Sequence, residues 1–149
     1  MKKGREFKNL PVIEISSGQL LGYVREIEIK ENSMLSGLYV TTLSNEVWFV
    51  PWDNIASIGR DAIFSKSEEK NLKVDSIPME KNFNCSPWVM TASGKNLGII
   101  EDIVIEESNG NVVGYEISDG YLKDLLMGRS VIARADVVTY GDDVFIVAD

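Results

Sequence analysis

The chain contains the stretch Ser17-Gly18-Gln19-Leu20-Leu21-Gly22-Tyr23-Val24-Arg25-Glu26-Ile27-Glu28-Ile29 and repeats it as Ser93-Gly94-Lys95-Asn96-Leu97-Gly98-Ile99-Ile100-Glu101-Asp102-Ile103-Val104-Ile105. Both glycines, the leucine before the second glycine and the last isoleucine keep one offset of 76 residues between the copies. Two copies indicate a duplicated domain, because a solenoid needs more repeats to bury its faces.

Each copy has the pattern of a tight turn that leads into a β-strand. The Ser-Gly pair favours a turn because glycine adopts positive φ without a steric clash. Apolar residues then recur mostly at every second position, which places one face of a strand on a core. The predicted equivalent core positions are Leu21, Ile27 and Ile29 in the first copy and Leu97, Ile103 and Ile105 in the second.

The second glycine of each copy interrupts the strand and predicts a bend or a bulge. Val24 and Ile100 break the alternation just after this glycine, where a bulge would reverse which residues face the core. We therefore predict tight turns at Gly18, Gly59, Gly94 and Gly141, and strand bends at Gly22 and Gly98.

The repeat continues beyond this stretch. Residues 36–40, Ser-Gly-Leu-Tyr-Val, match residues 113–117, Val-Gly-Tyr-Glu-Ile, at an offset of 77. Residues 54–63 match residues 136–145 at an offset of 82. The change in offset places most of the additional residues of the second copy between Ile117 and Val131.

The order of these blocks resembles the PRC-barrel family. The blocks are Gly-x-x-Leu-Gly-x-[Val/Ile]-x-[Glu/Asp]-Ile, a strand after a glycine, and a closing Gly-x-Asp-x-[Ile/Phe] strand, within residues 8–65 and 84–149. The resemblance implies an all-β protein of two tandem small PRC-type β-barrels, with one short helical turn in the second. The predicted domains are residues 1–64 and 83–149, joined by a polar linker at residues 65–82.

What this resemblance implies about function is limited. The family includes the cytoplasmic domain of the photosynthetic reaction-centre H subunit, the C-terminal domain of a ribosome-maturation factor and many small bacterial proteins. The motifs that carry the resemblance are structural glycines and core aliphatic residues, so they imply a fold and no single activity.

Composition and charge narrow the function classes. The net charge is −8, of which residues 1–75 contribute −1 and residues 76–149 contribute −7. This acidity argues against phosphate-backbone binding as the main role, and we interpret the basic residues near the N-terminus as a solvated terminus. No apolar run approaches the roughly 18–20 residues that cross a bilayer, and no signal peptide is recognisable. With the lone Cys85, these features predict a cytoplasmic protein without a membrane span.

Residues for catalysis or metal binding are few. The chain has no histidine, so Cys85 lacks the partner that would activate it, and no phosphate-binding glycine loop occurs. Neighbouring carboxylates on a strand point to opposite faces, so we predict that the pairs Glu101-Asp102, Glu106-Glu107 and Asp142-Asp143 do not converge. Trp48, Trp52 and Trp88 could stack on bases or peptide prolines, although core or rim packing is the commoner role. No catalytic residue, metal ligand or cofactor is predicted, and we expect no enzyme activity.

A helical signal lies in residues 119–130, Asp-Gly-Tyr-Leu-Lys-Asp-Leu-Leu-Met-Gly-Arg-Ser, where leucines recur at i, i+3 and i+4. A similar segment is expected in one subgroup of bacterial two-barrel PRC proteins. The segment either plugs the second barrel or docks a partner. The candidate docking residues are Tyr121, Leu122, Leu125, Leu126 and Met127.

The function predicted from the sequence is a non-enzymatic interaction or assembly module with an unidentified protein partner. A homodimer is one option, and nucleic-acid binding is not expected. The alternative is an RNA-processing or ribosome-associated factor, by analogy with the ribosome-maturation relative. An enzyme that uses only Asp and Glu has the least support.

Overall fold

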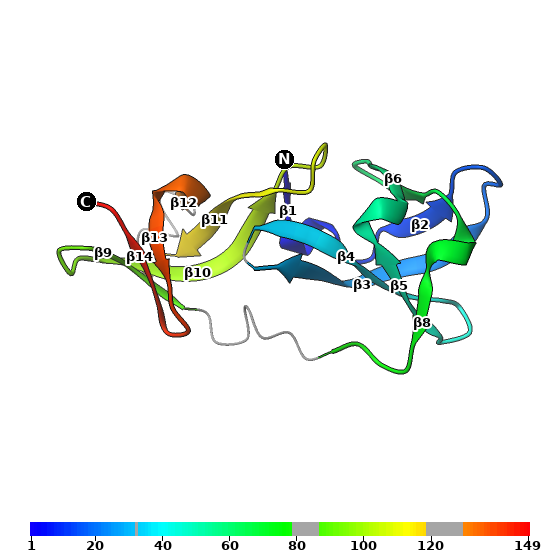
Figure 1. Cartoon of the computed structure of the whole chain (residues 1–149), viewed down its shortest axis with the longest axis horizontal. Helices are drawn as coiled ribbons and strands as arrows, with labels where there is room; N and C mark the ends of the chain where they lie inside the picture. Colours follow the sequence, from blue (N-terminus) through cyan, green and yellow to red (C-terminus); the bar gives the residue numbers. More distant parts are fainter. Residues whose placement is uncertain (32, 79–86, 119–129) are drawn as a thin grey trace. The chain divides into compact units, whose positions relative to one another are not determined.

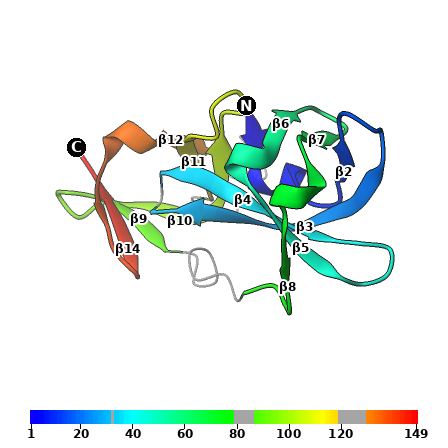
Figure 2. The ribbon, with the colours of Figure 1, turned by 45° about the vertical axis from the view of Figure 1, so that its right-hand side comes forward.

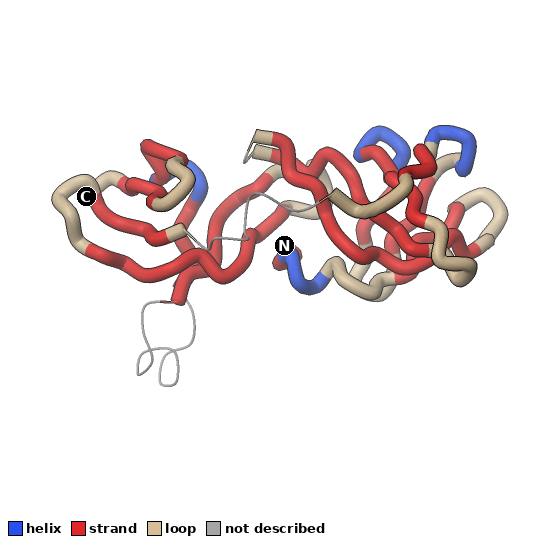
Figure 3. Tube along the Cα trace, turned by 90° about the horizontal axis from the view of Figure 1, so that it is seen from below, coloured by secondary structure: helices blue, strands red, loops and turns tan. Residues whose placement is uncertain are grey.

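The computed structural model describes residues 1–31, 33–78, 87–118 and 130–149. Strands make up most of this part of the chain, and its helical segments are 3-10 turns of three residues (Figure 3). Contacts divide the chain into two compact units. Unit 1 comprises Met1–Met79 and Ile105–Asn111, and unit 2 comprises Glu80–Val104 and Val112–Asp149.

The sheet of unit 1 has the order β6-β7-β2-β3-β4-β5-β8 (Figure 1). Figure 2 shows β3 and β4 side by side. The other edge of β4 pairs antiparallel with β5. Short segments β1 (Lys2–Lys3) and η1 (Gly4–Glu6) precede it. The strands and turns are β2 (Pro11–Glu14), β3 (Leu20–Lys30), β4 (Met34–Thr41), β5 (Val47–Pro51), η2 (Trp52–Asn54), β6 (Ile55–Ile58), β7 (Ile63–Ser65), η3 (Glu68–Lys70) and β8 (Leu72–Val74).

The second sheet repeats this topology, with the order β12-β11-β10-β9-β14-β13. In each sheet the short strand that precedes the long repeat strand forms a parallel pair, β2 with β7 and β9 with β14. The predicted duplication and the all-β class of two tandem PRC-type barrels are therefore confirmed. The elements are β9 (Trp88–Thr91), β10 (Asn96–Ile105), β11 (Val112–Ser118), β12 (Ser130–Ala133), η4 (Arg134–Asp136), β13 (Val137–Tyr140) and β14 (Val144–Val147).

A bulge lies where the alternation of the first copy breaks. The pairing of β3 with β4 shifts between Val24 and Glu26. Gly22 and Val24 are buried before the shift, and Ile27 is buried after it. The extra residue reverses the inward face of the strand, so both halves of β3 contribute to one core.

The predicted core positions are mostly correct. The four isoleucines are buried, whereas Leu21 and Leu97 are only half-buried. The placement of these two leucines in the core was wrong. Alternation puts each leucine on the face opposite the buried glycine that follows it, and the core side chain of this region is Val24 or Ile100 instead.

Unit 2 carries an aromatic cluster in its sheet. The ring of buried Tyr115 lies 5.3 Å from that of Phe145 and 6.3 Å from that of Tyr140, both edge to face. Burial raises the pKa of the Tyr115 hydroxyl well above its ordinary value, because the ionised form would lose its hydration. Edge-to-face packing of this kind adds specificity to the core.

The first part of the predicted linker has regular structure. Residues 68–70 form η3, and β8 pairs antiparallel with β5, placing Leu72 opposite Phe49 and Val74 opposite Val47. This part therefore packs on the first sheet, one of the options that its alternating apolar residues left open. The predicted boundaries at residues 64 and 83 stay a prediction.

Across the described residues, the structure contains no helix with the length and apolarity to span a membrane.

Candidate functional site

The six structural glycines lie in two kinds of position. Gly18 (φ 71) and Gly94 (φ 93) lie in the turns that precede β3 and β10. Gly59 and Gly141 lie in tight turns without a positive φ, and their amides donate to the carbonyls of Ala62 and Val144 at 2.8 and 3.0 Å.

The two strand glycines differ from each other. Gly98 has φ 134, a conformation that other residues rarely adopt. Gly22 has no positive φ, but a Cβ there would collide with the carbonyl group of Thr41. The same repeat position therefore requires glycine for two different reasons.

The candidate docking residues Tyr121, Leu122, Leu125, Leu126 and Met127 lie outside the described residues, and so does Cys85. That Glu106 and Glu107 do not converge on one ion stays a prediction. Both residues lie beyond the end of β10, where strand alternation no longer applies, and both line one pocket.

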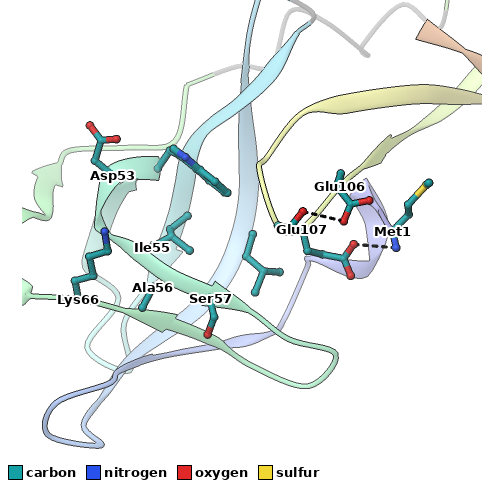
Figure 4. Close-up of a pocket in the computed structure, with 11 residues that line it drawn as sticks. Met1, Asp53, Ile55, Ala56, Ser57, Lys66, Glu106 and Glu107 are labelled. Atoms are coloured by element: carbon teal, nitrogen blue, oxygen red, sulfur yellow. Dashed lines mark hydrogen bonds and ion pairs between the residues drawn. The ribbon is translucent and has the colours of Figure 1, made fainter.

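This pocket, here named the Trp52 pocket, lies within unit 1 and has a volume of about 500 Å³. Figure 4 shows Glu106 and Glu107 on one side and Lys66 and Asp53 on the other. The lining residues are Met1, Trp52, Asp53, Ile55, Ala56, Ser57, Ile58, Lys66, Glu106, Glu107 and Ser108.

The two glutamates of the Trp52 pocket already have partners. The Met1 ammonium lies 2.9 Å from Glu107 Oε1, and Ser108 Oγ donates to Glu106 Oε1 at 3.3 Å. The hydrogen bond between Met1 and Glu107 lowers the pKa of the carboxyl and raises that of the amine. These contacts tie both glutamates to other groups of the chain.

A second pocket in unit 1, here named the Trp48 pocket, has a volume of about 290 Å³. It gathers the start of β3, the β4–β5 turn, β5 and the segment around η3. Its lining combines three large apolar side chains with polar and acidic ones. The lining residues are Leu20, Leu21, Thr42, Ser44, Glu46, Trp48, Glu68 and Asn71.

Local hydrogen bonds shape the β4–β5 turn on one side of the Trp48 pocket. Asn45 has φ 66, which Asn tolerates better than most residues. The Thr42 amide donates to the Glu46 carbonyl at 2.9 Å, and Thr42 Oγ1 accepts from the Glu46 amide at 3.1 Å. This short turn joins the antiparallel strands β4 and β5 and places Thr42, Ser44 and Glu46 beside the pocket.

The charges of the Trp48 pocket are acidic. Lys73 Nζ lies 2.8 Å from Glu46 Oε2, and this hydrogen bond lowers the pKa of Glu46 and raises that of Lys73. Glu68 lines the pocket from the other side with an exposed side chain. Among the residues that the structure describes, no lysine or arginine lines the pocket itself.

Asn71, one of the lining residues, belongs to a buried network of side-chain amides. Asn54, which is fully buried, donates from Nδ2 to Asn71 Oδ1 at 2.7 Å and to the Ser67 carbonyl at 2.6 Å. The Ser67 amide donates in turn to Asn54 Oδ1 at 3.0 Å. Asn71 is 6% exposed, and its own Nδ2 is buried without a hydrogen-bond partner.

Sequence reasoning identified Trp48 as a candidate binding residue but not its neighbours. Asn71 and Glu68 lie in a polar stretch interpreted as linker, and Leu20 precedes the leucine assigned to the core. One signal was available: Leu20 corresponds to Asn96 in the second copy, so the repeat does not require an apolar residue there.

The remaining candidates are the acidic residues and two of the tryptophans. No group of three or more His, Cys, Asp or Glu side chains suited to a metal occurs in the part of the chain that the structure describes. Trp88 is 43% exposed, and Trp52 packs its ring against Gly110 within unit 1.

A comparison of the sequence with models of known protein families identifies two matching segments. The model of the PRC-barrel domain matches residues 1–72 and 89–149. The chain therefore belongs to the PRC-barrel domain family, and the two matched segments correspond to the two sheets. No curated protein matches the chain.

Proposed function

We propose that the protein is a non-enzymatic interaction or assembly module that binds protein partners through its barrels. The observation that carries this proposal is the Trp48 pocket, a concave site whose lining brings Leu20, Leu21 and Trp48 together.

Exposed apolar side chains around the pocket support the same function. Leu20 is 41% exposed and Leu72, which follows Asn71 directly, is 58% exposed. Apolar side chains gathered at a concave site are typical of binding surfaces, whereas scattered ones are ordinary.

The alternative role as an RNA-processing or ribosome-associated factor requires cations to face phosphates. The Trp48 pocket offers carboxylates instead. The alternative nevertheless makes a distinct prediction, since binding to nucleic acid disappears as salt rises, whereas an apolar protein interface persists.

Capture from a lysate of the source organism tests the proposal. The immobilised full chain is expected to retain a defined set of proteins at both low and moderate salt. Replacing Leu20 by Asn, the residue of the second copy, should reduce this capture. Leu43→Asn is the matched control, because Leu43 is 81% exposed in the adjacent turn and does not line the pocket. Retention of nucleic acid alone, lost with salt, would favour the alternative.

The predicted cytoplasmic location and the option of a homodimer remain parts of this proposal. Fractionation of cells and sedimentation of the purified chain over a range of concentrations test them directly.

A further inference from the structure

We infer that the outer edge of β12 binds an extended strand of a partner protein, which adds to the second sheet antiparallel, as β8 adds to the first. The inference rests on the proposed interaction function and goes beyond it, because it names a second surface, in unit 2, and the kind of segment that this surface accepts. A strand that adds to a sheet edge gains affinity from main-chain hydrogen bonds and specificity from alternate side chains.

The first copy shows what covers the equivalent edge. Gly37 and Gly114 match in the repeat, and they lie opposite Pro51 of β5 and Ala133 of β12, so β5 and β12 are equivalent strands. The outer edge of β5 pairs with β8, whereas β12 is an end strand of its sheet among the residues that the structure describes. Alternate residues of an end strand direct their N–H and C=O groups away from the sheet. The second copy therefore keeps the strand that accepts β8 without, in the described part, the strand that covers it.

The other end strands have features that oppose strand addition, and β12 does not. The pairing of β6 shifts register between Ile55 and Ser57, and that of β13 between Val137 and Thr139. The central residue of β8 is Lys73. Bulges and lysines of this kind keep natural sheets from pairing at their edges. In contrast, β12 has the sequence Ser-Val-Ile-Ala, without charge or proline, and it pairs with β11 without a register shift.

The register of the first copy predicts which side chain of the partner is recognised. Leu72 of β8 lies opposite Phe49, and the residue of β12 equivalent to Phe49 is Val131. Val131 is 57% exposed. An apolar residue opposite Val131 would cover this side chain, and apolar cross-strand pairs stabilise a sheet. The expected partner segment is therefore extended and has an apolar residue at this position.

Charge and size argue against a second copy of the chain as the occupant. Unit 2 contains ten acidic and five basic residues, so pairing two copies through β12 would bring two acidic units together. A strand of four residues spans only about 13 Å, and two such strands bury far less than the roughly 800 Å² per partner of a stable complex. A segment of another protein avoids this repulsion and can extend its contacts beyond the strand.

Nuclear magnetic resonance titration of the full chain with a peptide tests this inference. The probe is the blocked peptide acetyl-Lys-Asn-Leu-Lys-Val-Asp-Ser-amide, the sequence of residues 70–76, which contains the strand that covers β5. We expect saturable shifts in β12 and slower hydrogen exchange at alternate amides of residues 130–133. We also expect cross-strand contacts between the leucine of the probe and Val131.

Two control peptides separate main-chain pairing from non-specific adhesion. One carries N-methyl groups at the leucine and the valine, and the other carries one at the central lysine. Each control blocks one of the two alternating sets of amides, and only one set faces β12. One control should therefore bind at least about fivefold more weakly, the equivalent of one main-chain hydrogen bond, and the other should bind like the probe.

Variants of the chain locate the binding site on β12. Val131→Lys removes the apolar partner of the leucine in the probe and should weaken binding about threefold to fivefold, the equivalent of one cross-strand pair. Val138→Lys adds the same charge to the end strand β13, at a position that is 61% exposed, and should leave binding unchanged. Melting curves verify that both variants are folded, and the methylated peptides test the inference without any variant.

Several results would overturn the inference. Slow exchange of alternate β12 amides in the chain alone, at every concentration, would mean that another segment of the same chain covers the edge. Slow exchange that appears only as the chain is concentrated would make a second copy the occupant. A probe that leaves β12 unshifted, or methylated controls that bind equally, would exclude strand addition.

The lysate experiment distinguishes this failure from that of the proposed function. If protein capture still decreases with Leu20→Asn while the probe does not bind β12, the proposed function stands and the strand-addition site is rejected. Loss of salt-resistant capture together with failure of the probe would reject both.

Discussion

Asn54 and Asp136 occupy the same place in the two copies, at the end of the 3-10 turns η2 and η4, but their side chains lie in different surroundings. Each keeps the same backbone hydrogen bond: the Asn54 carbonyl accepts from Lys66 at 2.8 Å and the Asp136 carbonyl from Ala148 at 3.1 Å. The Asn54 side chain is fully buried against Ser67 and Asn71, whereas Asp136 is exposed.

The contrast between Asn54 and Asp136 shows which features of the duplicated fold are shared and which differ. The backbone connection that shapes each sheet is kept, and the side chain changes where the neighbouring segment differs. Ser67 and Asn71 come from the segment between the copies, so the amide network and the Trp48 pocket arise from what was added beside the repeat.

The largest expected effect tests whether the two cores are equivalent. Ile27→Ala should destabilise unit 1, and Ile103→Ala unit 2, by about 2–5 kcal/mol each, because both side chains are buried at matching positions. Hydrogen exchange of amides in β3 and in β10 reads the two units separately. A loss under about 1 kcal/mol in one unit would show that its site collapses around the smaller side chain.

The second prediction separates the two turn residues. Asn54→Ala should cost about 2–4 kcal/mol, since several buried groups lose their partner. Asp136→Ala, at an exposed position, should change stability by less than about 0.5 kcal/mol. Denaturant unfolding of both variants measures the contrast. Similar values would mean that the amide network contributes no more than an exposed side chain.

The third prediction concerns the strand glycines. Gly22→Ala should lower the free energy of unfolding by about 1–3 kcal/mol, because its Cβ would collide with the Thr41 carbonyl. Gly98→Ala should lower it by a similar amount, because alanine rarely adopts a φ of 134. Gly59→Ala is the control, since it has no positive φ and its Cβ would lie 3.2 Å from the Ala62 carbonyl. The control should fall below about 1 kcal/mol because alanine also reduces the entropy of the unfolded chain.

The smallest effect compares the turn serines. Ser17 Oγ donates to Glu14 at 2.7 Å, and Ser93 Oγ donates to Asp149 at 2.9 Å, so each lowers the pKa of its acid. Ser17→Ala and Ser93→Ala should raise these pKa values toward the ordinary ones, as measured by resonance titration.

The sign of the linked pH effect follows from these lowered values. Each folded-state pKa lies below that of the unfolded chain, so the stabilisation is present above the unfolded value. It disappears as the pH falls through the folded value. The serine variants should therefore lose less stability than the wild type on acidification below the ordinary pKa values. An unchanged acid profile would mean that solvent screens both contacts fully.

The sequence by itself determined the duplication, the all-β class and much of the local geometry. Positive φ at Gly18 and Gly94 follows from local steric rules, and the bulge after Val24 appears as a break in alternation. These features depend on residues near one another in the chain, where glycine content and spacing restrict the backbone directly.

The composition of the candidate site, in contrast, depends on tertiary contacts. Leu20, Trp48 and Asn71 meet because β5 pairs with β8 and η3 packs on the turn residue Asn54, and these contacts join positions far apart in the sequence. The orientation of the Asn71 amide depends on that of Asn54, which depends on Ser67. No spacing along the chain records such a sequence of hydrogen bonds, because each is set by which distant segments come together.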